Sequence, residues 1–344
     1  MRNTVHRTTR PPVGRRLAAT AVALGSCLAL AVPVGTAQAA AADPVPTVFF
    51  GDSYTSNFGI APFQQDDTKR IFCFQAKENY PAAATRRLAV KGITLDVQSD
   101  VSCGGALVKD FWSEQQLPTG SLPPQQDAFK ADTRLAVGSM GGNTLGFPSI
   151  LKQCSDKLRD HALLPGEPVD PDEPAARCSE FFSSGDGKAW LDWRFETVKE
   201  ELEEMLTRMV YVSPEADTVL VGYPRIVPAD TAKCQTPAPG QKELPLADIP
   251  ADALPVLDQI QNRLNDVMKE AATAEGAAFV DLYGHTGDNT ACDGVNRGIG
   301  GLLEDSQLNL GGEQSIPWYA HPSERGRDIQ AEQVAAKVEQ ILNP

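Results

Sequence analysis

The stretch TVFFGDSYTSN, residues 47–57, joins an apolar, β-branched run to a glycine, an acid and a serine. Residues 48–50 are typical of a buried strand. A chain that turns into a helix after such a strand exposes its next hydroxyl at the edge of the sheet, so Ser53 occupies a suitable position for a nucleophile. Taken alone, Gly-Asp-Ser indicates only a turn, because Thr55 stands where the elbow G-x-S-x-G requires glycine.

Short apolar segments alternate with helical patterns along the rest of the chain. The strand-like segments are residues 48–50, 94–98, 135–137, 219–222 and 279–282. The helical patterns are residues 80–90, 195–210, 254–274 and 329–342. This alternation predicts an α/β fold in which helices cover both faces of a parallel sheet of about five strands. Functional sites in such sheets form at the carboxyl ends of the strands.

The N-terminal residues are typical of a secretory signal peptide. Five arginines and no acid lie in residues 1–16, an apolar stretch covers residues 17–34, and Ala37-Gln38-Ala39 is a small-x-small cleavage pattern. We therefore predict a signal peptide over residues 1–39 and a secreted, extracellular protein. Arg15-Arg16 leaves the Sec and twin-arginine routes both open.

The exported part is strongly acidic. Without the five leader arginines, 26 basic residues face 45 acidic ones, which gives a net charge near −19. This charge argues against nucleic acid or an anionic membrane as the main partner. We expect a monomer without a stable membrane anchor.

Two proline-rich stretches, residues 153–188 and 226–255, interrupt the alternation of strands and helices. We interpret both as surface insertions, each held by a cysteine pair, that help to shape a substrate cleft. About 300 residues remain after the signal peptide, so one domain over residues 40–344 is expected.

Six cysteines remain in the exported part, at positions 73, 103, 154, 178, 234 and 292. No C-x-x-C occurs, which argues against a zinc site and favours three disulfides. Six cysteines allow 15 pairings. We expect the sequential pairs, Cys73–Cys103, Cys154–Cys178 and Cys234–Cys292, and loops of these lengths would each contribute about 3 to 4 kcal/mol in the chain-entropy model.

A serine nucleophile needs a base, and histidine is the usual one near neutral pH. The exported part has three histidines, His161, His285 and His321. For His161, in the charged first insertion, a solvated or capping role is expected, and for His285 a structural hydrogen bond. His321 precedes the last helical pattern, where a base would reach the edge of the sheet.

Acyl transfer also needs hydrogen-bond donors for the charge that develops on the carbonyl oxygen. Gly141-Gly142-Asn143 follows the third predicted strand, and Ser102-Cys103-Gly104-Gly105 follows the second. Each motif alone indicates a turn or a cap. Together, a serine after the first strand, a glycine after the second, an asparagine after the third and a late histidine form an ordered set that turns alone do not predict.

This set resembles the GDSL-type esterases of the SGNH hydrolase superfamily, and in particular the secreted actinobacterial esterases and lipases with three disulfides. The matching residues are Gly51-Asp52-Ser53-Tyr54-Thr55-Ser56, Gly105, Gly141-Gly142-Asn143 and His321-Pro322. The resemblance implies a flavodoxin-like three-layer α/β/α sandwich, with Ser53 as nucleophile and His321 as base. It also implies an oxyanion hole made by the N–H groups of Ser53 and Gly105 and the Asn143 amide.

Two residues depart from the family pattern. Thr144 stands where Gly-x-Asn-Asp has its acid, and Trp318 where Asp-x-x-His has its aspartate. We therefore predict a Ser53-His321 dyad in which the main-chain carbonyl of Trp318 orients the imidazole. Weaker candidates for a displaced third member are Glu313, Asp281 and Glu324.

The leading hypothesis is a serine hydrolase that cleaves carboxylic esters through an acyl-enzyme, without metal or cofactor. The resemblance favours lipid or acyl esters, with short-chain or carbohydrate O-acetyl esters as the alternative. The aromatics near the motifs, either as an acyl site or as core, are Phe58, Phe63, Phe111 and Trp112. Thr144 and Trp318 motivate a rival, a non-catalytic binding protein that keeps the fold. A metal-dependent hydrolase is disfavoured by the scattered histidines.

Overall fold

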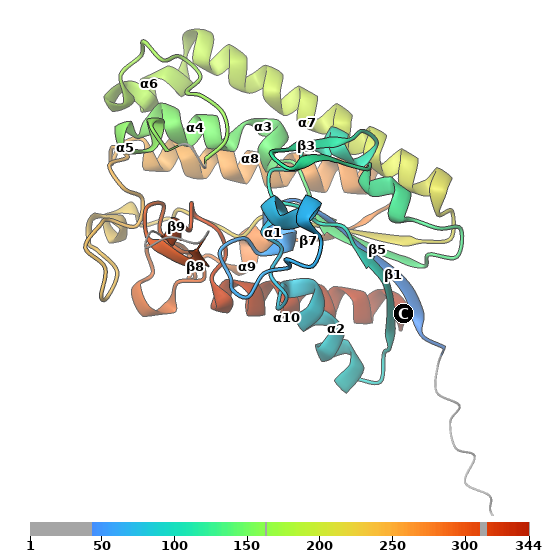
Figure 1. Ribbon diagram of the computed structural model, residues 1–344. Coiled ribbons are helices and arrows are strands. Elements are labelled where there is room, and N and C mark those ends of the chain that lie inside the picture. The colour runs from blue at the N-terminus through green and yellow to red at the C-terminus, as the bar shows by residue number, and fades with distance from the viewer. Residues whose placement is uncertain (1–42, 162–163, 310–314, 344) are drawn as a thin grey trace, which may run out of the picture. The chain divides into compact units, whose positions relative to one another are not determined.

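A five-stranded parallel sheet lies at the centre of the structure, a computed structural model that describes residues 43–161, 164–309 and 315–343. The order of its strands is β2 (Leu95–Asp100), β1 (Val45–Gly51), β5 (Leu135–Ser139), β6 (Asp217–Val221) and β7 (Ala278–Val280). The predicted α/β fold with a parallel sheet is confirmed (Figure 1). The predicted signal peptide and Glu313 lie outside the described residues.

Helices cover both faces of the sheet and form the outer layers of the sandwich (Figure 1). One face packs against α7 (Gly185–Val212) and α8 (Leu254–Ala274), and the other against α2 (Tyr80–Val90) and α10 (Glu324–Leu342). The two faces of β1 show the alternation, because Val48 and Phe50 belong to the first core and Phe49 to the second.

The register of the sheet brings the ends of β1 and β5 to the same edge. Gly51, the last residue of β1, lies opposite Ser139, the last residue of β5. The segments that follow these two strands are α1 (Ser53–Ser56) and α3 (Gly142–Leu145). The sequence blocks around Ser53 and Asn143 therefore meet at the carboxyl end of the sheet, as expected for this class of fold.

The helix boundaries follow local capping. Helix α2 begins after Asn79, whose side chain accepts a hydrogen bond from the N–H of Ala82, and has proline in its first turn. Helix α10 begins after Ser323, five residues before the predicted start at residue 329. Helix α7 extends the predicted segment 195–210 by ten residues at its start and two at its end.

The first predicted insertion has structure of its own. Residues 153–188 contain α5 (Asp156–Arg159), α6 (Cys178–Ser183) and the first turn of α7. Residues 226–255 are mostly irregular up to the start of α8. The other regular elements are α4 (Phe147–Cys154), α9 (Leu282–His285) and two antiparallel hairpins, β3 (Gln115–Leu117) with β4 (Gly120–Leu122) and β8 (Asp305–Asn309) with β9 (Ser315–Pro317).

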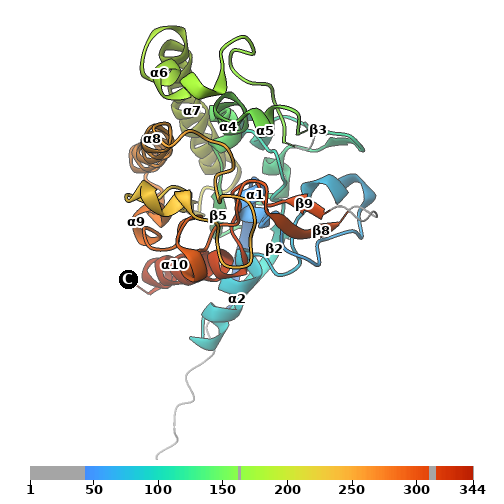
Figure 2. The ribbon, with the colours of Figure 1, turned by 90° about the vertical axis from the view of Figure 1, so that its left-hand side faces the viewer.

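Figure 2 shows α1 between the two helical layers. The segment after α1 is attached to the β8–β9 hairpin, because the N–H of Gln307 donates to the carbonyl of Gly59 at 2.9 Å. The side chain of Gln307 accepts from the N–H of Ala61 at 3.0 Å. The hairpin thus supports the chain that leads away from Ser53.

Candidate active site

The turn that presents Ser53 requires glycine at residue 51. Gly51 has φ +136°, and a β-carbon there would lie 2.3 Å from the Thr55 hydroxyl and 2.7 Å from the carbonyl of Ser139. Asp52 caps α1 by accepting the N–H of Tyr54 at 2.9 Å. Ser53 is the first residue of α1, so its N–H has no acceptor within the helix.

His321 reaches Ser53 across 268 residues of sequence. The distance between His321 Nε2 and Ser53 Oγ is 2.7 Å, and the distance between His321 Nδ1 and the carbonyl oxygen of Trp318 is 2.8 Å. A carbonyl only accepts hydrogen bonds, so Nδ1 carries the proton and Nε2 is left to accept the serine hydroxyl. This is the tautomer that a general base for Ser53 needs.

The backbone before His321 is unusual. Tyr319 and Ala320 have φ of 48° and 61°, the left-handed region that non-glycine residues rarely occupy. The Tyr54 hydroxyl donates to the carbonyl of Ala320 at 2.8 Å. This bond ties the strained turn to α1, so the residue after the nucleophile helps to place the imidazole.

Aromatic rings surround the imidazole. The ring centroids of Tyr54 and Phe58 each lie 4.8 Å from that of His321. Burial disfavours the charged form and lowers the pKa of His321 to about 4, against the opposing effect of its backbone hydrogen bonds. The imidazole is therefore neutral, and able to act as a base, over the whole physiological range.

The displaced acids considered from the sequence have other roles where they are described. Asp281 caps α9 by accepting the N–H of Gly284 at 2.8 Å, and Glu324 is an exposed residue at the start of α10. Of the other histidines, exposed His285 ends α9, whereas His161 Nδ1 lies 3.3 Å from the Tyr319 hydroxyl. His161 is half-buried, and the solvated or capping role expected for it stays a prediction.

Asn143 and Gly105 lie beside Ser53. The Asn143 side-chain amide donates one hydrogen bond to the carbonyl of Ala106 at 3.1 Å, and its second N–H remains for another acceptor. Gly105 has φ +75° and is exposed in the cleft that also contains Ser53, Asn143 and His321. The three predicted oxyanion donors thus line the same cavity.

Three disulfides join the described cysteines, Cys73–Cys103, Cys154–Cys178 and Cys234–Cys292. The first of them lies at the oxyanion loop, because Cys103 precedes Gly105 by two residues. The N–H of Gly104 also donates to the carbonyl of Cys73 at 3.0 Å. A covalent bond and a hydrogen bond therefore fix the chain just before Gly105.

A buried network behind the site was missed from the sequence. The Tyr223 hydroxyl donates to Asp52 Oδ2 at 2.5 Å and accepts the N–H of Gly142 at 2.8 Å. It thus links the residue before Ser53 to the residue before Asn143. Burial raises the pKa of Asp52 to about 7, although its hydrogen bonds to Tyr223 and Tyr54 oppose this. The position of Tyr223, directly after the fourth predicted strand, was the available signal.

The cavity above Ser53 has a volume of about 580 Å³ and a mainly apolar wall. Its apolar and aromatic lining residues include Phe58, Phe72, Phe74, Leu107, Leu117, Phe147, Leu151, Leu164 and Tyr319. Of the four aromatics considered from the sequence, only Phe58 lines it. Phe63 and Phe111 are buried in the core, and Trp112 packs under the Arg208 guanidinium.

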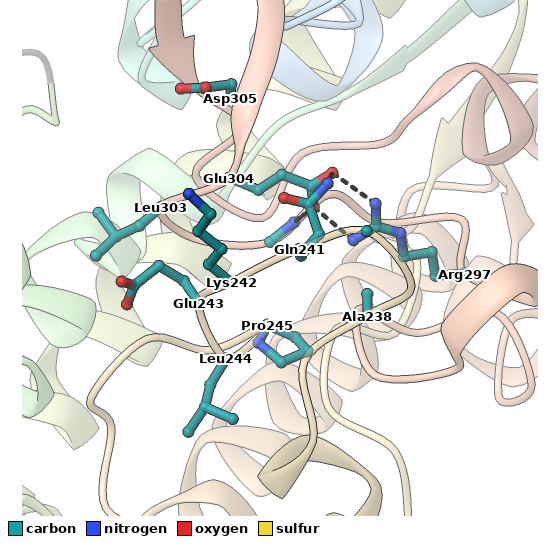
Figure 3. Close-up of a pocket in the computed structure, with 12 residues that line it drawn as sticks. Ala238, Gln241, Lys242, Glu243, Leu244, Pro245, Arg297, Leu303, Glu304 and Asp305 are labelled. Atoms are coloured by element: carbon teal, nitrogen blue, oxygen red, sulfur yellow. Dashed lines mark hydrogen bonds and ion pairs between the residues drawn. The ribbon is translucent and has the colours of Figure 1, made fainter.

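The two insertions differ in their relation to this cleft. The first contributes Leu164 and Pro165 to the wall. The second does not line it, so the expectation that both shape the cleft is wrong. Ala238 and residues 240–245 instead line a separate cavity of about 310 Å³ (Figure 3). Arg297 and Glu304 form an ion pair in that cavity, which contains neither Ser53 nor His321.

Residues 43–161, 164–309 and 315–343 contain no cluster of three or more His, Cys, Asp or Glu residues suited to a metal ion. Within the same ranges, none of the helices combines the length and apolar character that crossing a membrane requires.

The structure is an α/β protein with a serine and a histidine in contact at the carboxyl end of its parallel sheet, and comparison with known proteins gives the family. Residues 49–329 match the GDSL-like Lipase/Acylhydrolase family, and the chain belongs to it. The chain is 70% identical to a Streptomyces scabiei esterase over 345 residues, with all of both chains covered. It is 31% identical to Lipase 2 of Streptomyces coelicolor over 289 residues, 83% of this chain and 86% of that one.

Two solved structures share the fold. Phospholipase A1 of Streptomyces albidoflavus matches with a TM-score of 0.58 and 18% identity, over 86% of this chain and 100% of the other. The extracellular lipase of Streptomyces rimosus matches with a TM-score of 0.56 and 19% identity, over 85% and 99%. The family and these relatives together make the chain a carboxylic ester hydrolase.

Proposed function

We propose that the protein is a secreted serine esterase that works through a Ser53-His321 dyad and an acyl-enzyme. The observation that carries this proposal is the 2.7 Å contact between Ser53 Oγ and His321 Nε2 at the floor of an apolar cleft. The carbonyl of Trp318 takes the orienting place of an acid, because it accepts from Nδ1 at 2.8 Å.

The first half of the reaction acylates Ser53. His321 Nε2 takes the hydroxyl proton while Ser53 Oγ attacks the ester carbonyl carbon. The resulting oxyanion accepts hydrogen bonds from the N–H groups of Ser53 and Gly105 and from the free N–H of Asn143. The imidazolium then gives its proton to the leaving alcohol oxygen as the carbon–oxygen bond breaks. Water, deprotonated by the same imidazole, releases the acid in the second half.

An active-site label tests this function. A fluorophosphonate phosphonylates an activated serine, so we expect the wild type to take up one equivalent, and Ser53→Ala to take up none. Ser56→Ala is the matched control, because its buried hydroxyl lies in the same short helix and bonds to the carbonyl of Ser53. Mass spectrometry locates the label. A folded wild type that remains unlabelled would support the non-catalytic binding protein instead.

Export is part of the same proposal. Three disulfides suit an oxidising compartment, and residues 1–39 carry the features of a cleaved leader. When the labelling is done on the culture medium of an expressing cell, the labelled protein is expected there with its N-terminus near residue 40. A label confined to the cells would contradict secretion.

The apolar wall of the cleft favours esters with an extended acyl chain. Burial of one methylene contributes at most about 0.8 kcal/mol, so we expect kcat/KM for p-nitrophenyl esters to rise about tenfold or more from acetate to octanoate. Leu117→Glu places a charge in the cleft and should remove most of this rise while acetate hydrolysis stays within about threefold. Leu303→Glu, in the separate cavity, is the matched control.

A flat or falling series would instead assign the enzyme to short-chain or O-acetyl esters. The names of the lipase and phospholipase relatives agree with a longer acyl chain. The chemistry at Ser53 is the same in both cases, so this result decides the substrate and leaves the dyad untouched.

A further inference from the structure

Helix α7 lies against α3, which contains Asn143, and against the 3-10 turn η2 (Val108–Phe111), which begins three residues after Gly105. Glu201 is a half-buried acid on the side of α7 that faces them. Its carboxylate accepts the Thr144 hydroxyl at 3.3 Å. The main chain of Lys109 also stabilises the charged form of this carboxylate.

Thr144 relays this contact to the Gly105 loop. Its Oγ1 accepts the N–H of Val108 at 2.8 Å. A hydroxyl has one proton and two lone pairs. Donation of that proton to Glu201 therefore turns the lone pairs of Thr144 towards Val108. The carboxylate thus selects the orientation in which Thr144 can hold the loop.

A second bond joins the same two segments closer to the chemistry. The Asn143 amide donates to the carbonyl of Ala106 at 3.1 Å. Residues 106 and 108 are therefore both bonded to neighbouring residues of α3. Glu201, on α7, contacts one of these two residues, Thr144. An oxyanion hole needs its donors fixed to about 0.5 Å, and here the donors come from two separate segments.

Burial raises the pKa of the Glu201 carboxyl above its ordinary value, against the opposing effects of Thr144, the Lys109 main chain, Lys109 and Arg194. The Glu201 carboxyl accepts the Thr144 hydroxyl in either protonation state, because it keeps an acceptor oxygen. Arg194, also on α7, donates through Nε to the carbonyl of Leu145 at 3.1 Å. Helix α7 therefore contacts the last two residues of α3, through Glu201 at Thr144 and Arg194 at Leu145.

We propose that Glu201 is a positioning residue that holds the Gly105 and Asn143 donors at a fixed separation, in place of the acid that the family pattern carries at residue 144. The inference rests on the proposed function, because it concerns the same oxyanion hole. Glu201 does not touch substrate and acts only through Thr144 and the η2 backbone.

Kinetics with p-nitrophenyl butyrate test the proposal. Glu201→Ala is expected to lower kcat about tenfold with KM within twofold, because the donors act mainly in the transition state. A trifluoromethyl ketone, which adds Ser53 Oγ to form an oxyanion, should bind about tenfold more weakly. Glu201→Gln keeps an acceptor for Thr144 and should recover activity to within about threefold. Glu200→Ala, an exposed neighbour on α7, is the control and should match the wild type.

Thr144 gives an independent measurement. Thr144→Val keeps the shape but loses the hydroxyl, and should resemble Glu201→Ala, whereas Thr144→Ser should resemble the wild type. The Thr144→Val/Glu201→Ala double variant should be no worse than about twofold below either single variant, because both remove one linkage. The Thr144 pair also decides the matter if Glu201→Ala does not fold.

Three results separate the possible failures. A kcat and a ketone affinity equal to those of Glu200→Ala would overturn the positioning role, even if the melting temperature falls. Fully additive losses in the double variant would overturn the link through Thr144. Hydrolysis that persists in Ser53→Ala would contradict the proposed function itself, whatever Glu201 does.

Discussion

His321→Ala is expected to lower kcat/KM for a p-nitrophenyl ester by about 10⁴- to 10⁶-fold, because within residues 43–161, 164–309 and 315–343 only His321 contacts the Ser53 hydroxyl to take its proton. The His321 ring is held on one side by the Trp318 carbonyl and on the other by the Ser53 hydroxyl, at 2.8 and 2.7 Å. Serine and histidine act as one unit, so Ser53→Ala and the double variant should show losses of the same size rather than their product.

A second histidine, His285, provides the control for this prediction. His285→Ala removes an exposed imidazole at the end of α9 and should leave kcat/KM within twofold. Circular dichroism of each preparation checks the fold, because variants without Ser53 or His321 cannot be titrated with a fluorophosphonate. More than about 1% residual activity in His321→Ala, with an intact fold by circular dichroism, would mean that another group serves as the base.

The pH profile reports the same imidazole. Burial lowers the pKa of His321 to about 4, and the neutral form is the active one. Activity should therefore stay level as pH falls from 8 to about 5 and decline only towards pH 4, whereas an ordinary histidine would lose it near 6.5. Asp52, with its pKa near 7, contacts Tyr223 and Tyr54. If the pH profile also shows a change of activity near pH 7, and this change disappears in Asp52→Asn, it belongs to the Asp52 carboxyl.

The arrangement of the four motif residues could be predicted because it depends on sheet topology alone. In a parallel sheet the residues that follow each strand meet at one edge. Ser53, Gly105 and Asn143 follow β1, β2 and β5, which are neighbours in the sheet. His321 precedes α10, which packs beside α2 under the same sheet. The spacing and the order of the apolar segments are therefore enough to predict that these four residues lie close together.

The supporting residues could not be predicted, because they depend on how helices pack. Tyr223 and Glu201 reach the site from β6 and α7, and no local pattern shows which of the many acids of α7 faces inward. The hydrophobic pattern of this helix is also weak at its start, where Gly185 and Gly187 lie within it. Gly187 fits there because a β-carbon would meet the carbonyl of Phe181 at 2.4 Å.

The lining of the cleft was predicted poorly for the same reason. Phe58 lies five residues after the nucleophile, just beyond the end of the short α1. Three other aromatic residues of the lining are Phe72, Phe74 and Phe147. The direction of the segments that carry them is set by a disulfide at Cys73 and by the packing of α4. Closeness to a motif in sequence was a good guide for Phe58, five residues from Ser53, and failed for Phe63, ten residues away.

Asn143→Ala is expected to lower kcat about 10²- to 10³-fold with KM changed less than threefold, because the lost N–H serves the oxyanion rather than the ground-state carbonyl. The side chain already gives one N–H to the Ala106 carbonyl at 3.1 Å, which aims the other into the cleft. Asn143→Asp should be at least as damaging, since a carboxylate offers no proton and repels the developing charge.

Separate measurement of kcat and KM shows whether Asn143 acts in the chemical step or in binding of the ester. Asn143→Ala should still be labelled by a fluorophosphonate at Ser53, only more slowly, because the nucleophile and its base are unchanged. Asn262→Ala, an exposed amide on α8, is the matched control and should keep wild-type kinetics. If Asn143→Ala raised KM about 100-fold at an unchanged kcat, Asn143 would be holding the bound ester rather than its transition state, and the oxyanion would have to rest on the backbone N–H groups of Ser53 and Gly105.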